Sequence, residues 1–265
     1  MKVLIIGRGR VGNGLRRSLQ ASGALEVRSV GRVYAPSTVS PADAIIIAVS
    51  DDSIAAVARA IAPNLKPGAT VLHCAGARGT DELGACEATG AAIGVMHPLV
   101  SFPSRRNNPS LRGTTFTVNG SRRAIATSRR IAKACGARVL VAQTGDAGYH
   151  AAAALAANGS AALAFVSVTT LERLGFDRRA AERAIGGLLQ TVGENVQSLG
   201  VPGALTGPIA RGEVEAVANH RAALRRLNRD SLRAYDAIVP IIVGCARAAG
   251  LGRAKASKIL RATKG

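Results

Sequence analysis

The sequence predicts an α/β domain built on a doubly wound, mostly parallel sheet, followed by an all-α C-terminal domain. Short apolar runs alternate with helical patterns through the first half of the chain, and strands separated by helices form parallel sheets with right-handed crossovers. After residue 143 the strand patterns stop and long helical patterns follow. We therefore expect one domain over residues 1–143 and a second over residues 144–265.

The predicted strands of the first domain are short and apolar. The third of them reads Ala-Ile-Ile-Ile-Ala-Val and is apolar on both of its faces, as is typical of a strand buried inside a parallel sheet. The predicted strands cover residues 3–6, 26–30, 44–49, 70–73, 92–96, 114–118 and 138–141.

The helical patterns are separated by strands in the first domain and by glycine or proline breaks in the second. Pro240 lies inside one pattern, where we expect a kink or break because proline removes a helical hydrogen bond. The predicted helices cover residues 11–21, 53–62, 80–88 and 122–134, and then residues 147–174, 179–199, 211–219, 221–249 and 253–260.

The composition is that of a folded protein with a basic surface. Hydrophobic residues make up 48% of the 265 residues, which excludes a mostly disordered chain. The formal net charge is +19, and such a charge attracts nucleic acids without sequence preference. The basic residues are spread along the whole chain, however, and only 3% of residues are aromatic, so stacking platforms for single strands are scarce. We expect no specific nucleic-acid partner.

The cysteine spacing indicates whether a metal site or a disulfide framework is present, and the apolar stretches indicate whether the protein is secreted or spans a membrane. Four cysteines lie far apart and form no C-x-x-C pair, so we expect neither a metal site nor a disulfide framework. The chain enters an apolar strand at once, without the pattern of a secretory signal. The longest apolar stretch, residues 151–168, is interrupted at Asn158, which favours a helix buried at a domain or subunit contact over a membrane span. These features predict a cytoplasmic protein.

A glycine-rich turn after the first strand matches the dinucleotide fingerprint G-x-G-x-x-G. The match is specific because it follows an apolar strand and opens a helix. Gly7 makes the tight turn, Gly9 lets the backbone approach a pyrophosphate, and Gly12 allows close packing of helix and strand. The helix N-terminus, which begins with Arg10 and Val11, favours negative charge. The alternative is a glycine-rich turn without a ligand.

The end of the second strand indicates which nicotinamide cofactor is bound. NAD-preferring proteins place an acidic residue about 20 residues beyond the fingerprint to bind the ribose. This chain has Ser-Val-Gly-Arg there, ending at Arg32, and a guanidinium pairs well with a 2′-phosphate. We therefore predict NADP(H) rather than NAD(H). The alternative is an exposed arginine without this role.

The carboxyl ends of the next strands supply further cofactor contacts, because ligands bind beyond the carboxyl ends of parallel strands. We expect Ser50 and Asp51 to lie beside the cofactor. The small residues Cys74, Ala75 and Gly76 leave room for a flat ring near the backbone.

Two histidines are the candidate acid–base groups. His97, with Ser101 nearby, follows the fifth strand, and His150 opens the helical region. A histidine there can donate a proton to a carbonyl or imine while hydride arrives. Asn158 lies eight residues after His150, about 80° round a regular helix, and can border the same cleft. The alternative is that His97 and His150 are structural.

Together these motifs resemble the bacterial Rossmann-like proteins that carry the C-terminal domain of unknown function 2520, within the wider superfamily of 6-phosphogluconate dehydrogenase-like reductases. The resemblance extends over nearly the whole chain. It is carried by residues 7–12, Ser50-Asp51-Asp52, His73-Cys74-Ala75-Gly76-Ala77, His97-Pro98-Leu99 with Phe102, Tyr149-His150-Ala151-Ala152-Ala153, Asn158 and residues 205–212.

The resemblance implies a Rossmann domain joined to a helical domain that often builds a dimer, and NAD(P)-dependent hydride transfer. Relatives include pyrroline-5-carboxylate reductase, ketopantoate reductase and 3-hydroxyisobutyrate dehydrogenase. The hydroxyacid dehydrogenases and ketopantoate reductase use a lysine near the start of the helical domain, whereas this chain has His150 in the comparable region.

We therefore expect an NADP(H)-dependent oxidoreductase that transfers hydride to or from a small oxo acid or imine, with a ketopantoate-like 2-oxo acid as the leading substrate. We expect it to form a homodimer through the helical domain. The alternative is a non-catalytic NADP(H)-binding regulatory protein.

Overall fold

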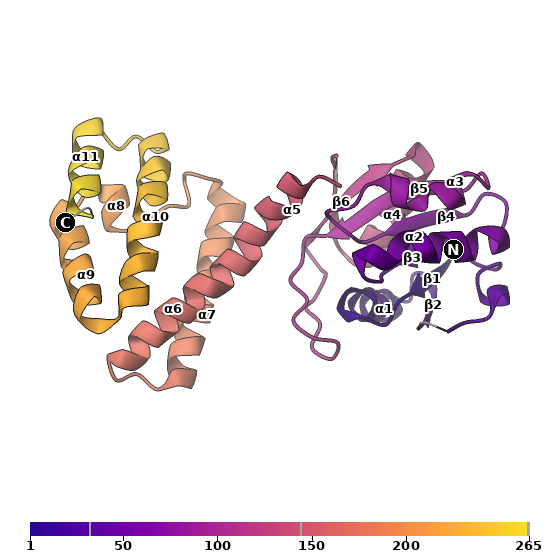
Figure 1. The fold of residues 1–265 in the computed structure, drawn as a ribbon, viewed down its shortest axis with the longest axis horizontal. Helices are drawn as coiled ribbons and strands as arrows, with labels where there is room; N and C mark the ends of the chain where they lie inside the picture. The colour runs from indigo at the N-terminus through magenta and orange to yellow at the C-terminus, as the bar shows by residue number, and fades with distance from the viewer. Residues whose placement is uncertain (32, 144, 264–265) are drawn as a thin grey trace. The chain divides into compact units, whose positions relative to one another are not determined.

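The computed structural model describes residues 1–31, 33–143 and 145–263. The chain divides into two compact units, Met1–Ala154 and Leu155–Gly265, whose elements are labelled in Figure 1. Helix α5 (Ala147–Ala154) belongs to the first unit by its contacts, although the sequence pattern groups it with the helices that follow.

The first unit is built on one sheet of seven strands: β1 (Lys2–Ile6), β2 (Glu26–Val30), β3 (Ala44–Ile47), β4 (Thr70–His73), β5 (Ala92–Pro98), β6 (Thr115–Gly120) and β7 (Arg138–Val141). Their order across the sheet is β2-β1-β3-β4-β5-β6-β7. All neighbours are parallel except β5 and β6. The strand order reverses direction between β1 and β3, which is where open α/β sheets bind ligands.

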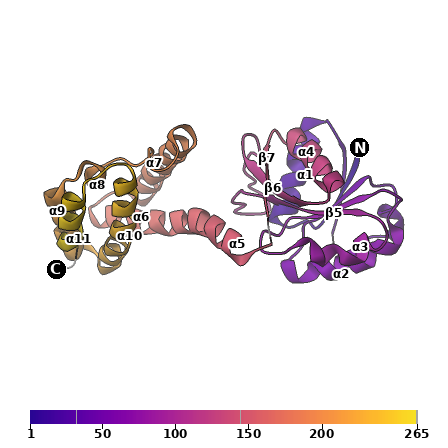
Figure 2. The ribbon, with the colours of Figure 1, turned by 90° about the horizontal axis from the view of Figure 1, so that it is seen from above.

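Helices cover both faces of the sheet, as Figure 2 shows. On one face lie α1 (Arg10–Ser22) and α4 (Arg122–Ala134), and on the other lie α2 (Ile54–Ile61) and α3 (Gly84–Glu87). The predicted fold class, a doubly wound and mostly parallel sheet followed by helices, is confirmed.

Each face of the sheet has its own hydrophobic core. Leu15 and Leu19 of α1 are fully buried in one core, and Ile54 and Ile61 of α2 are buried in the other. Burying one such side chain stabilises the fold by about 1.5–3 kcal/mol. Successive residues of β1 and β3 alternate between the two cores, which explains why these strands are apolar at every position.

One predicted helix of the first unit takes another form, and one connection has no helix. Residues 80–88 form a 3₁₀ turn, Thr80–Leu83, followed by the single turn of α3, instead of one helix. Gly84 lies at the junction, and glycine weakens a helix interior because it loses much conformational freedom. Between β5 and β6 a loop takes the place of a helical crossover, and β6 therefore runs antiparallel to β5.

The second unit is helical. Helices α6 (Ser160–Arg173) and α7 (Arg178–Leu199) pack against each other. The others are α8 (Pro208–Arg211), α9 (Val214–Leu227), α10 (Arg229–Ala248) and α11 (Arg253–Ala262), and their buried core consists of Ile209, Val217, Val239, Val243, Ala246, Ala256 and Ile259.

The predicted break near residue 220 is wrong, and at Pro240, where a kink or break was expected, the helix does not break. Helix α9 continues to Leu227, and Asn228 begins α10 by accepting a hydrogen bond from the backbone N–H of Asp230 at 3.0 Å. Asparagine is a favoured residue at this capping position. Helix α10 continues through Pro240, which is exposed.

Among the described helices, the continuous stretch Ala147–Arg173 is long and apolar enough to cross a membrane by length and composition alone. Within it, α5 buries no residue and α6 buries one, Val168. Helix α7 likewise buries Ala181 and leaves most of its apolar side chains exposed.

Candidate active site

The glycine-rich turn closes tightly around two of its glycines and stays open at the third. Gly7 has φ +117°, and a Cβ there would overlap the carbonyl oxygen of Ala48. A Cβ on Gly12 would overlap the carbonyl oxygen of Gly7. A Cβ on Gly9, in contrast, would meet one atom within 4 Å, the Ala48 oxygen at 3.9 Å. Gly7 and Gly12 are thus required by packing, whereas Gly9 borders open space.

The N-terminus of α1 is suited to an anion. Gly9 is the N-cap and provides no side-chain hydrogen bond, and the first turn has no acidic residue. The first backbone N–H groups of a helix have no helical partner, and they carry a partial positive charge. Arg10 is exposed at the first helical position, and Val11 is half-buried against the core. The arrangement fits the pyrophosphate of a dinucleotide.

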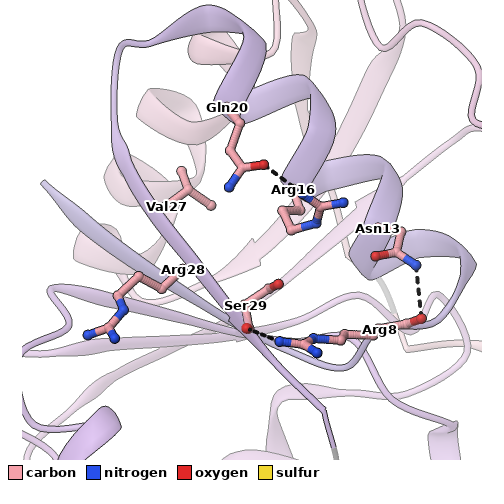
Figure 3. A pocket seen from close by; sticks show the side chains of 7 residues that line it. All are labelled: Arg8, Asn13, Arg16, Gln20, Val27, Arg28 and Ser29. Atoms are coloured by element: carbon pink, nitrogen blue, oxygen red, sulfur yellow. Dashed lines mark hydrogen bonds between the residues drawn. The ribbon is translucent and has the colours of Figure 1, made fainter.

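A cavity of about 450 Å³ lies beside this turn, between α1 and the edge strand β2 (Figure 3). The Arg8 guanidinium reaches over β2 and donates a hydrogen bond to the carbonyl oxygen of Ser29 at 3.0 Å. Asn13 in turn donates to the carbonyl oxygen of Arg8 at 3.0 Å. Arg16 and Arg28 also line the cavity, and the described lining residues include no carboxylate, so the cavity favours an anion.

The other expected cofactor residues of the first strands have different environments. Arg32 lies outside the described residues. Ser50 follows β3, and its Oγ lies 2.9 Å from Ser53 Oγ. Asp51 is exposed, and its neighbour Asp52 pairs with Arg78 at 2.7 Å, which joins the loop after β3 to the loop after β4.

His73 is a structural histidine held by backbone contacts on both ring nitrogens. Its ring is fully buried, its Nδ1 accepts a hydrogen bond from Ala75 N–H at 3.2 Å, and its Nε2–H donates to the Gly79 oxygen at 2.8 Å. Burial lowers its pKa. Burial likewise raises the pKa of the Cys74 thiol to about 12, so Cys74 is an unreactive neutral thiol.

Gly76 provides the surface on which His97 lies. A Cβ at Gly76 would stand 2.9 to 3.0 Å from three atoms of the His97 ring. The Gly76 carbonyl oxygen accepts a hydrogen bond from Gly145 N–H at 3.2 Å, which ties the start of α5 to the end of β4. Gly76 therefore fixes the position of the imidazole and of the helix that follows.

His97 lies at the centre of a cluster of polar side chains. Its Nδ1 is 2.8 Å from the Tyr149 hydroxyl, which donates a hydrogen bond to Thr117 Oγ1 at 2.7 Å. The His150 ring lies 6.2 Å from the His97 ring, centroid to centroid. Burial, with the nearby charge of His150, lowers the pKa of His97 to about 4. His97 is therefore a neutral imidazole at physiological pH, and His150 is exposed beside it.

The two remaining expected residues are Ser101 and Asn158. Ser101 is exposed in the loop after β5. Asn158 is in the second unit, on a π-helical turn, Leu155–Gly159, that joins α5 to α6. The angle of 80° between His150 and Asn158 assumed a regular α-helix and does not apply across this turn.

Three residues of this region received no role from the sequence. Arg8 lies at a variable position of the fingerprint, and only the length and charge of its side chain could have indicated a role in anion binding. Tyr149 precedes His150 in the motif that carries the family resemblance. Thr117 is a fully buried hydroxyl in β6, but its position opposite His97 could be found only from the pairing of β5 with β6.

Residues 114–240 match the family described as Domain of unknown function (DUF2520). No curated protein sequence matches the chain. A solved structure from Bacteroides fragilis, provisionally classed as an NADP oxidoreductase, is similar at 19% identity, with 92% of this chain and 98% of that chain covered and a TM-score of 0.66.

Two enzymes of known activity have similar structures. A pyrroline carboxylate reductase from Plasmodium falciparum, solved with NADP bound, shares 14% identity over 93% of this chain and 98% of its own, with a TM-score of 0.61. An imine reductase from Streptomyces aurantiacus shares 13% identity over 100% of both chains, also with a TM-score of 0.61. At such identities the likeness is one of fold. Residues 114–240 thus match the DUF2520 family model, and the chain shares the fold of these solved oxidoreductase structures, as its sequence resemblance predicted.

Proposed function

We propose that the chain is an NADP(H)-dependent reductase or dehydrogenase that transfers hydride to or from a small oxo acid or imine. The observation that carries the proposal is that one unit holds both an open dinucleotide-type turn at Gly9 and adjacent imidazoles of His97 and His150. The solved proteins of this fold include a reductase with NADP bound and an imine reductase, which supports the cofactor and the reaction class.

The residues at the carboxyl ends of the parallel strands fit the parts of the cofactor. When bound, NADPH would supply the hydride. The uncapped N-terminus of α1 would hold the pyrophosphate, and small residues after β4 would leave room for the nicotinamide ring. The residues assigned to these contacts are Gly7, Gly9, Arg10, Val11 and Gly12 for the pyrophosphate, Ser50 and Asp51 beside the ribose, and Cys74, Ala75 and Gly76 beside the ring.

The preference for NADP(H) over NAD(H) rests on arginines. Arg8 is held at the carboxyl end of β2 by its hydrogen bond to Ser29, and Arg16 and Arg28 line the same cavity. Guanidinium groups bind phosphate through charge-assisted hydrogen bonds. We propose that this cavity, with Arg32 beyond the end of β2, receives the 2′-phosphate.

Replacing Arg8 with glutamate is expected to weaken NADPH binding by at least about tenfold, or 1.4 kcal/mol, and to change NADH binding much less. The new carboxylate would repel the 2′-phosphate, which NADH lacks. Isothermal titration with both cofactors measures the two losses. Arg59→Glu, on the exposed surface of α2, makes the same change of charge and is the control. An equal loss for both cofactors in Arg8→Glu argues against this phosphate site.

His150 is proposed as the proton donor for the reacting oxygen or nitrogen, because it is exposed next to His97 and takes the region where related dehydrogenases have a lysine. His97, Ser101 and Asn158 are proposed to contact the substrate.

A ketopantoate-like 2-oxo acid is the leading substrate. The direct test is NADPH oxidation with a panel of 2-oxo acids and cyclic imines. Tight NADPH binding without oxidation of any of them would favour a regulatory cofactor-binding protein.

A homodimer through the helical domain is proposed from the exposed apolar face of α7. Leu188, Val192, Val196 and Leu199 are 59%, 45%, 43% and 64% exposed. They are spaced by four, four and three residues, so they share one face of the helix. An apolar stripe of this kind on an isolated chain indicates a contact with another helix surface, and a second copy supplies one by symmetry.

Val192→Glu is expected to convert the dimer to monomer, because a carboxylate inside an apolar contact is costly to desolvate. Gln190→Glu adds the same charge about 200° away around α7 and is expected to leave the dimer intact. Light scattering after size-exclusion chromatography gives the mass of each variant. A wild-type monomer, or equal effects of the two variants, would disprove this interface.

A further inference from the structure

A chain of three side chains runs from the sheet to helix α5. His97 of β5 and Thr117 of β6 are directly opposite each other in the antiparallel pairing of these strands. The Tyr149 hydroxyl of α5 reaches both, at 2.8 Å from His97 Nδ1 and 2.7 Å from Thr117 Oγ1. The two strand residues therefore share one tyrosine oxygen.

The direction of these hydrogen bonds fixes the position of one proton on His97. The Tyr149 hydroxyl has a single hydrogen, and it donates this hydrogen to Thr117 Oγ1. At its other contact, with His97 Nδ1, the Tyr149 oxygen can therefore only accept a hydrogen bond. His97 must therefore carry its hydrogen on Nδ1 and donate it to Tyr149. In a neutral imidazole this leaves Nε2 with a lone pair and no hydrogen.

The surroundings hold His97 neutral. Burial is the largest influence and lowers the pKa of His97, and His150 on α5 and His73 on β4 lower it further, whereas the carboxylate of Asp51 in the loop after β3 raises it. Together they bring the pKa of His97 to about 4. The Tyr149 pKa is raised by burial, so this hydroxyl also keeps its hydrogen at neutral pH.

The Nε2 atom is available to a ligand. Within residues 1–31, 33–143 and 145–263 no hydrogen-bond partner of Nε2 is found, and Nε2 is not among the buried polar atoms without a partner. Solvent therefore reaches it. The ring occupies space that only a glycine at position 76 leaves free, since a Cβ there would lie 2.9 to 3.0 Å from three of its atoms.

We propose that Thr117 and Tyr149 position His97 as a hydrogen-bond acceptor, so that the ligand group facing Nε2 carries a hydrogen, as a hydroxyl, an ammonium or an iminium N–H does. A carbonyl or carboxylate oxygen there would place lone pair against lone pair. The inference rests on the proposed function for the identity of the ligand as a substrate. Under that function, His97 orients the substrate, and a proton for a reduced carbonyl must come from another group.

The test is the tautomer of His97, read by nitrogen-15 NMR of the full chain with labelled histidine at pH 7 and without cofactor or substrate. The imidazole signals that disappear in the variant His97→Asn are assigned to His97. The wild type is expected to show Nδ1–H at His97 and the opposite form, Nε2–H, at His73, whose contacts fix that tautomer. An Nε2–H signal at His97 would overturn the inference.

Two variants test the residues that set this tautomer. In Thr117→Val the Tyr149 hydroxyl loses its acceptor and is expected to donate to His97 Nδ1, which moves the histidine hydrogen to Nε2. Thr117→Ser keeps the acceptor and is expected to retain Nδ1–H. Tyr149→Phe removes the oxygen that accepts the hydrogen bond from Nδ1–H, so His97 is expected to lose its preference for the Nδ1–H form. This second variant keeps the test possible if Thr117→Val fails to fold.

Tyr235→Phe is the matched control. It removes a hydroxyl 3.2 Å from His220 Nδ1 in the second unit and is expected to leave His97 unchanged. If His97 keeps Nδ1–H in both Thr117→Val and Tyr149→Phe, these residues do not position it. Because these spectra need no cofactor, the inference can fail while the proposed function stands, and the reverse is also true.

Discussion

Gly9→Val is expected to lower the affinity for NADPH by at least about 100-fold, or 2.8 kcal/mol, without loss of the folded structure. Gly9 has φ −74° and ψ −167°, an extended conformation that valine adopts readily. Among the described residues, a Cβ at this position would have one atom within 4 Å, the Ala48 oxygen at 3.9 Å, which is an ordinary contact. The added side chain would therefore occupy the volume that a bound pyrophosphate needs, and little else.

Gly12→Ala is the contrasting variant for this prediction. Its Cβ would overlap the carbonyl oxygen of Gly7, so the turn and helix α1 would have to move apart. We expect a lower melting temperature for Gly12→Ala and an unchanged one for Gly9→Val. Thermal unfolding and NADPH titration of both variants separate the two effects. Wild-type NADPH affinity in folded Gly9→Val would show that the turn does not bind the cofactor.

His150→Ala is expected to reduce the rate of reduction by about 10²- to 10⁴-fold, the range that a positioned general acid contributes. Its side chain is exposed on α5, so the folded structure should survive the change, and it is not among the residues proposed to hold NADPH. Cofactor affinity should therefore stay at the wild-type value while turnover falls.

His220→Ala is the control for His150→Ala. His220 is also exposed on a helix and lies against a tyrosine ring, Tyr235 at 6.0 Å, but it belongs to the second unit. Steady-state oxidation of NADPH with the best substrate of the panel gives the two rates. Undiminished turnover in His150→Ala would exclude it as the proton donor.

The parts of the fold that depend on local sequence were predictable. Strands β1, β3 and β4 are buried on both faces, so they need unbroken apolar runs, and the predicted runs agree with them to within two residues. The fingerprint turn was also predictable, because its three glycines are close together in sequence, although the atom that excludes a Cβ at Gly7 belongs to the distant Ala48.

The parts that depend on distant contacts were not predictable. The pairing of His97 with Thr117 requires β6 to run antiparallel to β5, and the apolar pattern of a strand carries no information on its direction. The Tyr149 contact further requires that α5 returns to the end of β4, where Gly145 bonds to Gly76. The break at Asn228 was missed because the helical periodicity continues on both sides of it, and a single capping residue indicates a helix boundary only weakly.

Calorimetric titration of the wild-type full chain with NADPH and NADH measures directly whether the first unit binds NADP(H). We expect one NADPH bound per chain, at least about tenfold (1.4 kcal/mol) more tightly than NADH. Binding of neither cofactor, or tighter binding of NADH, would contradict this expectation.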